Sequence, residues 1–143
     1  MTGLLLSMLL SAAIPGELSV LMDEARTKRV ELSYSCVVPM GELPVRSEGQ
    51  LLVENNCYML KADGVEIYCD GKSRWTVDPK AKEVYIEDAP GVLEFVENPE
   101  KYFSQLKDFK LLSSSTSEPA GNEGEFRFDD SALSSDWTVT DLR

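Results

Sequence analysis

Few side chains in this sequence have the type and spacing that catalysis or metal binding requires. The 143 residues include no histidine, so the chain lacks the commonest general base near neutral pH and the commonest metal ligand. Cys36, Cys57 and Cys69 form no Cys-x-x-Cys motif and have no zinc-binding spacing. Acidic neighbours such as Asp129 and Asp130 are expected by chance in a chain with 25 acidic residues, and they lack the spacing of a calcium loop. We therefore expect no enzyme activity, no metal site and no cofactor.

The overall charge narrows the classes of partner. A formal net charge of −11 repels phosphate backbones, so we expect no nucleic-acid binding. The same charge disfavours direct docking on an anionic membrane. The length suits a single domain, residues 17–143, which we expect to be monomeric.

The N-terminus carries a short apolar run. Residues 4–13 read LLLSMLLSAA, which is too short to span a bilayer but has the length of the apolar region of a signal peptide. Ser11 and Ala13 are small residues at the positions that precede a cleavage site. We predict a signal peptide over residues 1–13 and a secreted mature chain. The alternative is a buried N-terminal helix.

The first half of the mature chain predicts one helix followed by a meander of strands. Residues 17–30 have an apolar stripe at helical spacing. The predicted strands cover residues 32–38, 47–53, 57–62, 74–78 and 83–87. Asp63-Gly64 predicts a two-residue hairpin turn, which places Leu60 opposite Ile67 and Tyr58 opposite Cys69. Cys57 and Cys69 then lie on opposite faces and cannot form a disulfide, while Cys36 could pair with either.

The second half is less regular. Residues 90–106 predict two short helical turns with a break near Pro99. A strand follows at residues 108–112, then a flexible polar loop at 113–124 and strands at 125–128 and 137–142.

An antiparallel sheet that packs against a helix and carries a kinked apolar segment can enclose a pocket. We therefore predict an apolar ligand-binding cavity. The residues expected to line it are Tyr58, Leu60, Ile67, Trp75, Tyr85, Phe95, Tyr102 and Phe103. The alternative is that these residues form the ordinary core of a small domain.

The order of these elements resembles the LolA-like family of periplasmic outer-membrane lipoprotein carriers. The resemblance covers residues 17–112 and begins with ELSVLMDEARTKRVELSYSCVV and EGQLLVENNCYMLK. Its tightest part, CDGKSRWTVDPKAKEVYI at residues 69–86, is similar to the family's Asp-Gly-Lys-x-x-Trp-x-Tyr-Asp-Pro pattern. Asn98-Pro99 with Tyr102-Phe103 resembles the family's lid segment.

The resemblance implies an α+β fold: a curved antiparallel sheet, or half-barrel, with an N-terminal helix and a helical lid on its concave face. It implies a periplasmic chaperone that carries the acyl chains of lipoproteins or lipid to the outer membrane. Its implied partners are an inner-membrane release complex and an outer-membrane acceptor.

The sequence departs from the family in two places. Asn55-Asn56 stands where well-studied carriers have an Arg-Pro whose arginine latches the lid. The family fold also continues for several strands beyond the point where this sequence ends, so we expect a short relative or an incomplete chain. The alternative function is a non-catalytic half-barrel module that binds a protein partner in envelope sensing or assembly.

Overall fold

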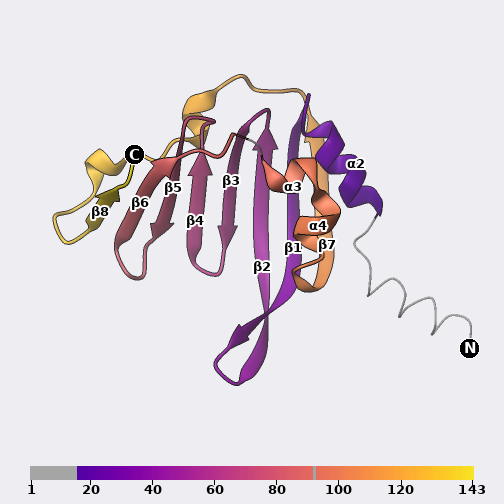
Figure 1. The fold of residues 1–143 in the computed structure, drawn as a ribbon, viewed down its shortest axis with the longest axis horizontal. Coiled ribbons are helices and arrows are strands. Elements are labelled where there is room, and N and C mark those ends of the chain that lie inside the picture. The colour runs from indigo at the N-terminus through magenta and orange to yellow at the C-terminus, as the bar shows by residue number, and fades with distance from the viewer. Residues whose placement is uncertain (1–15, 92) are drawn as a thin grey trace, which may run out of the picture.

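The computed structural model describes residues 16–91 and 93–143, so the predicted signal peptide lies outside the described residues. The structure is a curved, unclosed sheet of eight strands with a few short helices (Figure 1). The helices are α2 (Gly16–Glu24), α3 (Glu94–Glu97) and α4 (Pro99–Phe103), and the 3-10 turns are η1 (Glu123–Phe126) and η2 (Asp130–Ala132). The strands are β1 (Arg29–Met40), β2 (Leu43–Glu54), β3 (Cys57–Ala62), β4 (Val65–Cys69), β5 (Ser73–Asp78), β6 (Glu83–Asp88), β7 (Lys107–Ser117) and β8 (Thr138–Asp141).

The strand order is β7-β1-β2-β3-β4-β5-β6-β8. Strands β1 to β6 form the predicted antiparallel meander, and β7 pairs antiparallel with β1. The prediction of a fully antiparallel sheet is wrong at one edge, because β8 runs parallel to β6. The fold is therefore α+β with a mixed sheet.

The predicted β3–β4 hairpin register is confirmed. Leu60 pairs with Ile67 and Tyr58 pairs with Cys69. Asp63 and Gly64 have φ angles of 55° and 75°, the positive values that a type I′ turn needs at both central positions. Because side chains alternate along a strand, this register assigns Tyr58, Leu60 and Ile67 to one face of the sheet. All three cysteines are buried free thiols.

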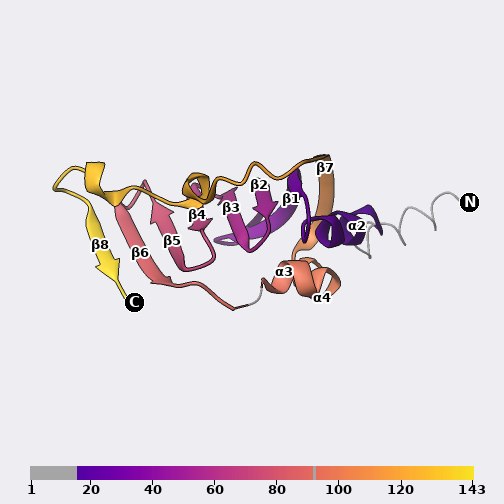
Figure 2. The ribbon, with the colours of Figure 1, turned by 90° about the horizontal axis from the view of Figure 1, so that it is seen from above.

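The helices pack on one face of the sheet, called here the helix face (Figure 2). The apolar stripe of α2 is buried there, with Leu18 and Met22 fully buried, as is Ala25 directly after the helix. The helix ends at Glu24, earlier than the predicted residue 30. Val30 belongs instead to β1, where it is fully buried and paired with Val53 of β2. Strand pairing and burial outweigh the helix propensity of this segment, which its alanine, arginine and lysine residues favour.

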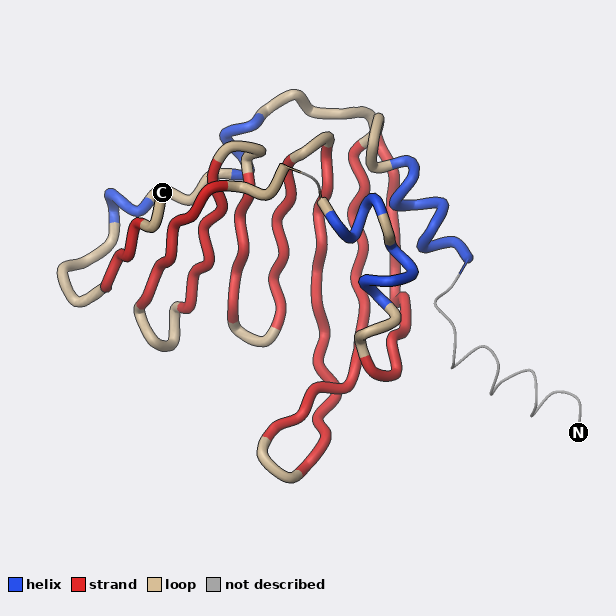
Figure 3. Tube along the Cα trace, in the orientation of Figure 1, coloured by secondary structure: helices blue, strands red, loops and turns tan. Residues whose placement is uncertain are grey.

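The segment after β7 crosses the opposite face of the sheet (Figures 2 and 3). Its predicted assignments need correction, because residues 113–117 extend β7 and residues 123–126 form η1 rather than part of a strand. Phe126 is fully buried, and Phe128, Leu133 and Trp137 pack on a second core on this face. That core contains Trp75, Val77, Val84 and Ile86. The predicted loop is therefore shortened to residues 118–122, and a second packed layer follows it.

Buried and half-buried charged groups attach the crossing segment to the sheet. The Glu54 carboxylate, 4% exposed, accepts hydrogen bonds from the backbone N–H groups of Ala120 and Gly121 at 2.7 and 3.2 Å. Arg29 donates two hydrogen bonds to Glu125. Charge-assisted bonds of this kind are stronger than neutral ones, so they orient a segment that lacks strand pairing until β8.

Asp70 makes a similar attachment and predicts a pH dependence of stability. Burial acts to raise the pKa of this carboxyl, but hydrogen bonds from the Ser73 and Lys72 backbone and from Arg127 outweigh it and lower the pKa. A carboxyl whose pKa is lower in the folded state stabilises the fold above its unfolded pKa. That contribution is lost as the pH falls through the folded value.

We expect Asp70→Asn to lower the free energy of unfolding by about 2 kcal/mol at pH 7. The difference from wild type should begin to shrink as the pH falls below about 4, because the carboxyl is then protonated first in the unfolded state, and it should disappear once the pH falls through the lower pKa of the folded carboxyl. Urea denaturation at a series of pH values measures this difference. A pH-independent difference would show that the carboxylate charge does not contribute.

Gly49 permits a close contact between neighbouring strands. A Cβ at this position would lie 2.3 Å from Cζ of Tyr34, which is paired with Gly49 across β1 and β2 and is 7% exposed. We expect Gly49→Ala to lower the free energy of unfolding by about 1–3 kcal/mol, because the buried ring has little room to move. Gly91→Ala is the control, since a Cβ there meets nothing within 4 Å. Equal stability of the two variants would contradict this packing argument.

Candidate functional site

An apolar cavity of about 290 Å³ lies between the helix face and the α3–α4 segment. Six of the eight predicted residues line it: Tyr58, Leu60, Ile67, Phe95, Tyr102 and Phe103. The other lining residues are Tyr34, Leu51, Arg74, Pro90, Leu93, Glu94 and Leu106. Its volume is at the lower end of the range of small-molecule pockets.

Two structural elements bring the predicted residues together. The β3–β4 hairpin supplies Leu60 and Ile67, which are both half-buried. The break between α3 and α4 at Asn98-Pro99 lets two short helices present aromatic side chains to the same cavity. Proline is favourable at the first position of a helix, which explains why α4 restarts there.

Aromatic rings beside the cavity contact one another in series. Phe95 meets the Tyr58 ring edge-on at a centroid distance of 5.1 Å and lies 5.8 Å from the Tyr102 ring. Phe103 lies 5.1 Å from Tyr102 and 5.4 Å from Phe109 of β7. These edge-on and tilted geometries are the favourable arrangements of aromatic pairs. They pack the α3–α4 segment against the sheet through apolar contacts.

Trp75 and Tyr85 do not line the cavity, so their predicted placement needs correction. Trp75 pairs with Tyr68 and Ile86, a register that directs it to the opposite face and into the second core. Tyr85 pairs with Thr76, is 41% exposed, and donates a hydrogen bond from its hydroxyl to Glu83 at 3.2 Å.

The sequence-based reasoning also missed several lining residues. Tyr34 and Leu51 lie on β1 and β2, and Arg74 lies on β5 next to Trp75. Extending the strand alternation across the sheet identifies Leu51, because Leu51 pairs with Leu60. Arg74 had no such signal, because a charged residue is not expected beside an apolar cavity.

Burial affects two tyrosine hydroxyls at the cavity, those of Tyr34 and Tyr58. Burial raises the pKa of Tyr34 to about 12. Burial also raises the pKa of Tyr58, and the nearby Arg74 guanidinium opposes part of that rise. These hydroxyls are therefore protonated at neutral pH, where they can donate hydrogen bonds but cannot act as bases.

The thiols have the properties of structural cysteines. Burial raises the pKa of Cys57 to about 11 and also raises the pKa values of Cys36 and Cys69. Since the thiolate is the reactive form, these side chains are poor nucleophiles at neutral pH. Within residues 16–91 and 93–143, no group of three or more cysteine, aspartate or glutamate side chains is arranged to hold a metal ion.

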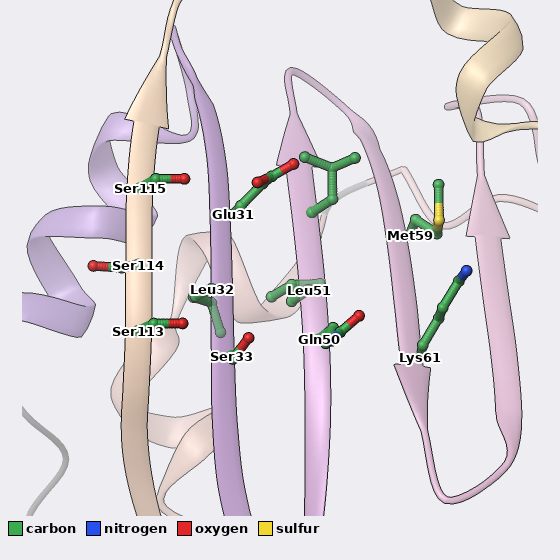
Figure 4. Close-up of a pocket in the computed structure, with 11 residues that line it drawn as sticks. Glu31, Leu32, Ser33, Gln50, Leu51, Met59, Lys61, Ser113, Ser114 and Ser115 are labelled. Atoms are coloured by element: carbon green, nitrogen blue, oxygen red, sulfur yellow. The ribbon is translucent and has the colours of Figure 1, made fainter.

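A second hollow, a polar groove of about 500 Å³, lies on the opposite face of β7, β1, β2 and β3 (Figure 4). Ser113 and Ser115 of β7 lie beside Ser33 and Glu31 of β1, to which they are paired. The groove has a larger volume than the cavity, and its lining is more polar. Its serines have no histidine beside them to act as a base, because the chain contains none. The groove therefore offers no serine–histidine pair, and its lining mixes serine and charged side chains with leucine and methionine.

No protein-family model matches the chain, and a comparison with curated proteins finds no match. None of the described helices is long and apolar enough to cross a membrane. The geometry of the cavity is therefore the basis for assigning a function.

Proposed function

We propose that this chain is a non-catalytic periplasmic carrier that holds an acyl chain of a lipoprotein or lipid in the apolar cavity. The observation that carries the proposal is the convergence of six predicted residues on one apolar cavity. These residues come from two sequence segments that were assigned to the site because of hairpin register and helical spacing. Five of the six also belong to the core of the helix face or pack against it: Tyr58, Phe95 and Phe103 are buried, and Leu60 and Ile67 pack against that core. The proposal rests on the space that this core leaves unfilled, because protein cores have few voids larger than a water molecule.

The cavity has room for one medium-length chain. An apolar cavity of about 150 Å³ holds one benzene, so by proportion about 290 Å³ accommodates about a dozen carbon atoms. Ten buried methylenes would contribute about 8 kcal/mol, from which the cost of association must be subtracted. Reversible binding of one acyl chain is consistent with these magnitudes.

In this proposal the sheet is a half-barrel and the α3–α4 segment is its lid. The turn at Asn55-Asn56 has no arginine to latch the lid. An ion pair joins Arg26, just after α2, to Glu97 of α3 at 2.8 Å, with both side chains 44% exposed. Exposed ion pairs contribute at most about 1 kcal/mol, so this contact would let the lid open easily.

The proposed partners follow from the same function. An inner-membrane release complex would load the carrier, and an outer-membrane acceptor would receive the acyl chain. The net charge of −11 disfavours direct contact with anionic lipid, which supports transfer through protein partners.

Native mass spectrometry of the chain purified from a periplasm tests the proposal. We expect adducts whose masses correspond to acyl chains or acylated peptides, and lipid extraction should release them. A ligand-free mass, together with no binding of added acylated peptide, would contradict the carrier function.

The second candidate is a module that binds a protein partner through a sheet edge. It is favoured by β7, an eleven-residue strand at one end of the sheet whose residues 112–117 are exposed. An extended peptide can add to such an edge through backbone hydrogen bonds. A ligand-free chain that captures a peptide would support this function.

A further inference from the structure

Arg74 is the one basic residue among the described residues that line the cavity. It lies on β5 and pairs with Cys69 of β4 and Glu87 of β6. Its Nε and Nη2 atoms donate hydrogen bonds to Oε1 of Glu87 at 3.0 and 2.8 Å. The Arg74 side chain is 32% exposed, so it lies at the boundary between the apolar cavity and solvent.

The charge of Arg74 is already balanced by its neighbour. Glu87 forms an ion pair with the guanidinium, and Glu94 also lines the cavity. The three side chains together carry a formal charge of −1, in a chain whose net charge is −11. A ligand carboxylate that approached Arg74 would therefore meet net negative charge and would have to compete with Glu87 for the guanidinium.

A ligand with a neutral hydrogen-bond acceptor is not repelled by this negative charge and need not displace Glu87. A guanidinium has five N–H donors; the bonds to Glu87 use two of them, and the Tyr58 hydroxyl is a further hydrogen-bond partner. The remaining donors can bind the carbonyl oxygen of an ester or amide without removing Glu87. Such a bond is charge-assisted on the donor side and adds no negative charge to the site.

We propose that the cavity selects neutral acyl esters and amides over free fatty acids, because Arg74 donates to the acyl carbonyl while Glu87 excludes a carboxylate. This inference rests on the proposed acyl-carrier function and specifies the chemical class of its ligand. Arg74 is then a residue that binds the ligand head, and Glu87 sets the specificity.

Isothermal titration calorimetry of the full chain at pH 8 tests the selection. The ligands share a twelve-carbon chain: laurate, 1-monolauroylglycerol, and a peptide with an amide-linked lauroyl group. We expect the wild type to bind both neutral ligands at least about 10-fold more tightly than laurate. The glyceride and the peptide distinguish a lipid source from an acylated protein source.

Three variants separate the roles of the two residues. Glu87→Gln should raise the affinity for laurate by at least about 5-fold and change the glyceride affinity by less than about 2-fold. Arg74→Met keeps a long apolar stem and should weaken glyceride binding by about 10-fold. Glu66→Gln removes the same charge from β4 on the opposite face, beside Lys61, and should leave laurate binding unchanged.

The outcomes distinguish this inference from the function on which it rests. Equal wild-type affinity for laurate and the glyceride, or equal laurate affinity in Glu87→Gln and Glu66→Gln, would overturn the selection and leave the carrier function standing. Failure of all three lauroyl ligands to bind the wild type would overturn both.

Discussion

Leu60→Asp is expected to weaken acyl binding by at least about 30-fold. Leu60 lines the cavity and pairs with Ile67, so an aspartate there places a carboxylate among apolar side chains. An unpaired charge in such surroundings costs at least about 2 kcal/mol, and the acyl chain would have to remove its remaining water. Ile67→Asp should have the same effect from the neighbouring strand, and either charge can also impair folding. Titration with the lauroyl glyceride measures the loss.

Met59→Asp is the matched control for this prediction. Met59 precedes Leu60 on β3 and, like Leu60, is half-buried, but it lines the polar groove on the opposite face. The control should bind the glyceride within about 3-fold of wild type. Circular dichroism and urea denaturation of both variants separate a binding defect from a folding defect. Wild-type stability and binding in both Leu60→Asp and Ile67→Asp would show that these residues do not form the site.

Phe103→Ala is expected to lower the free energy of unfolding by about 3–5 kcal/mol. Phe103 is 2% exposed and contacts Tyr102 and Phe109, so it attaches α4 to the sheet. The alanine variant loses the apolar contacts and leaves a cavity that the surrounding strands cannot easily fill. This loss is a large part of the stability of about 5–15 kcal/mol that is typical of a folded domain. We expect it to lower the melting temperature by roughly 10–15 °C.

Tyr102→Ala on the same helix gives the comparison. Tyr102 is 39% exposed, and we expect its replacement to cost less than about 1.5 kcal/mol. Tyr102 also lines the cavity. Its replacement should therefore cost more free energy of acyl binding than free energy of unfolding. A Phe103→Ala variant as stable as Tyr102→Ala would show that α4 does not contribute to the core.

Local chemistry determined the part of the site that the sequence predicted correctly. Asp63-Gly64 is a turn whose type sets the register of its two strands, so Leu60 and Ile67 could be assigned to one face before the structure was known. The proline at residue 99 predicted the break that separates α3 from α4. In each case the deciding interaction lies within a few residues along the chain.

The face on which Trp75 lies could not be predicted from the local sequence. The turn at residues 70–72 is longer than two residues, so its sequence does not set the register of β5 against β4. The observed register pairs Trp75 with Tyr68 and turns it away from the cavity, which brings Arg74 to the helix face. A shift of one residue in the register moves every side chain of a strand to the other face of the sheet. The register of β5 was therefore decided only by its pairing in the folded sheet.

The sequence by itself determined the meander, the apolar stripe of α2 and the hairpin residues of the cavity. Only the tertiary structure decided that residues 118–137 cross the opposite face and that β8 joins β6 in parallel. Those choices depend on Glu54 binding the backbone at Ala120, on the burial of Phe126 and on Phe128 packing on the second core. Contacts between residues so far apart in the chain leave no periodic signal in either segment, because they are formed by the packing of the finished sheet.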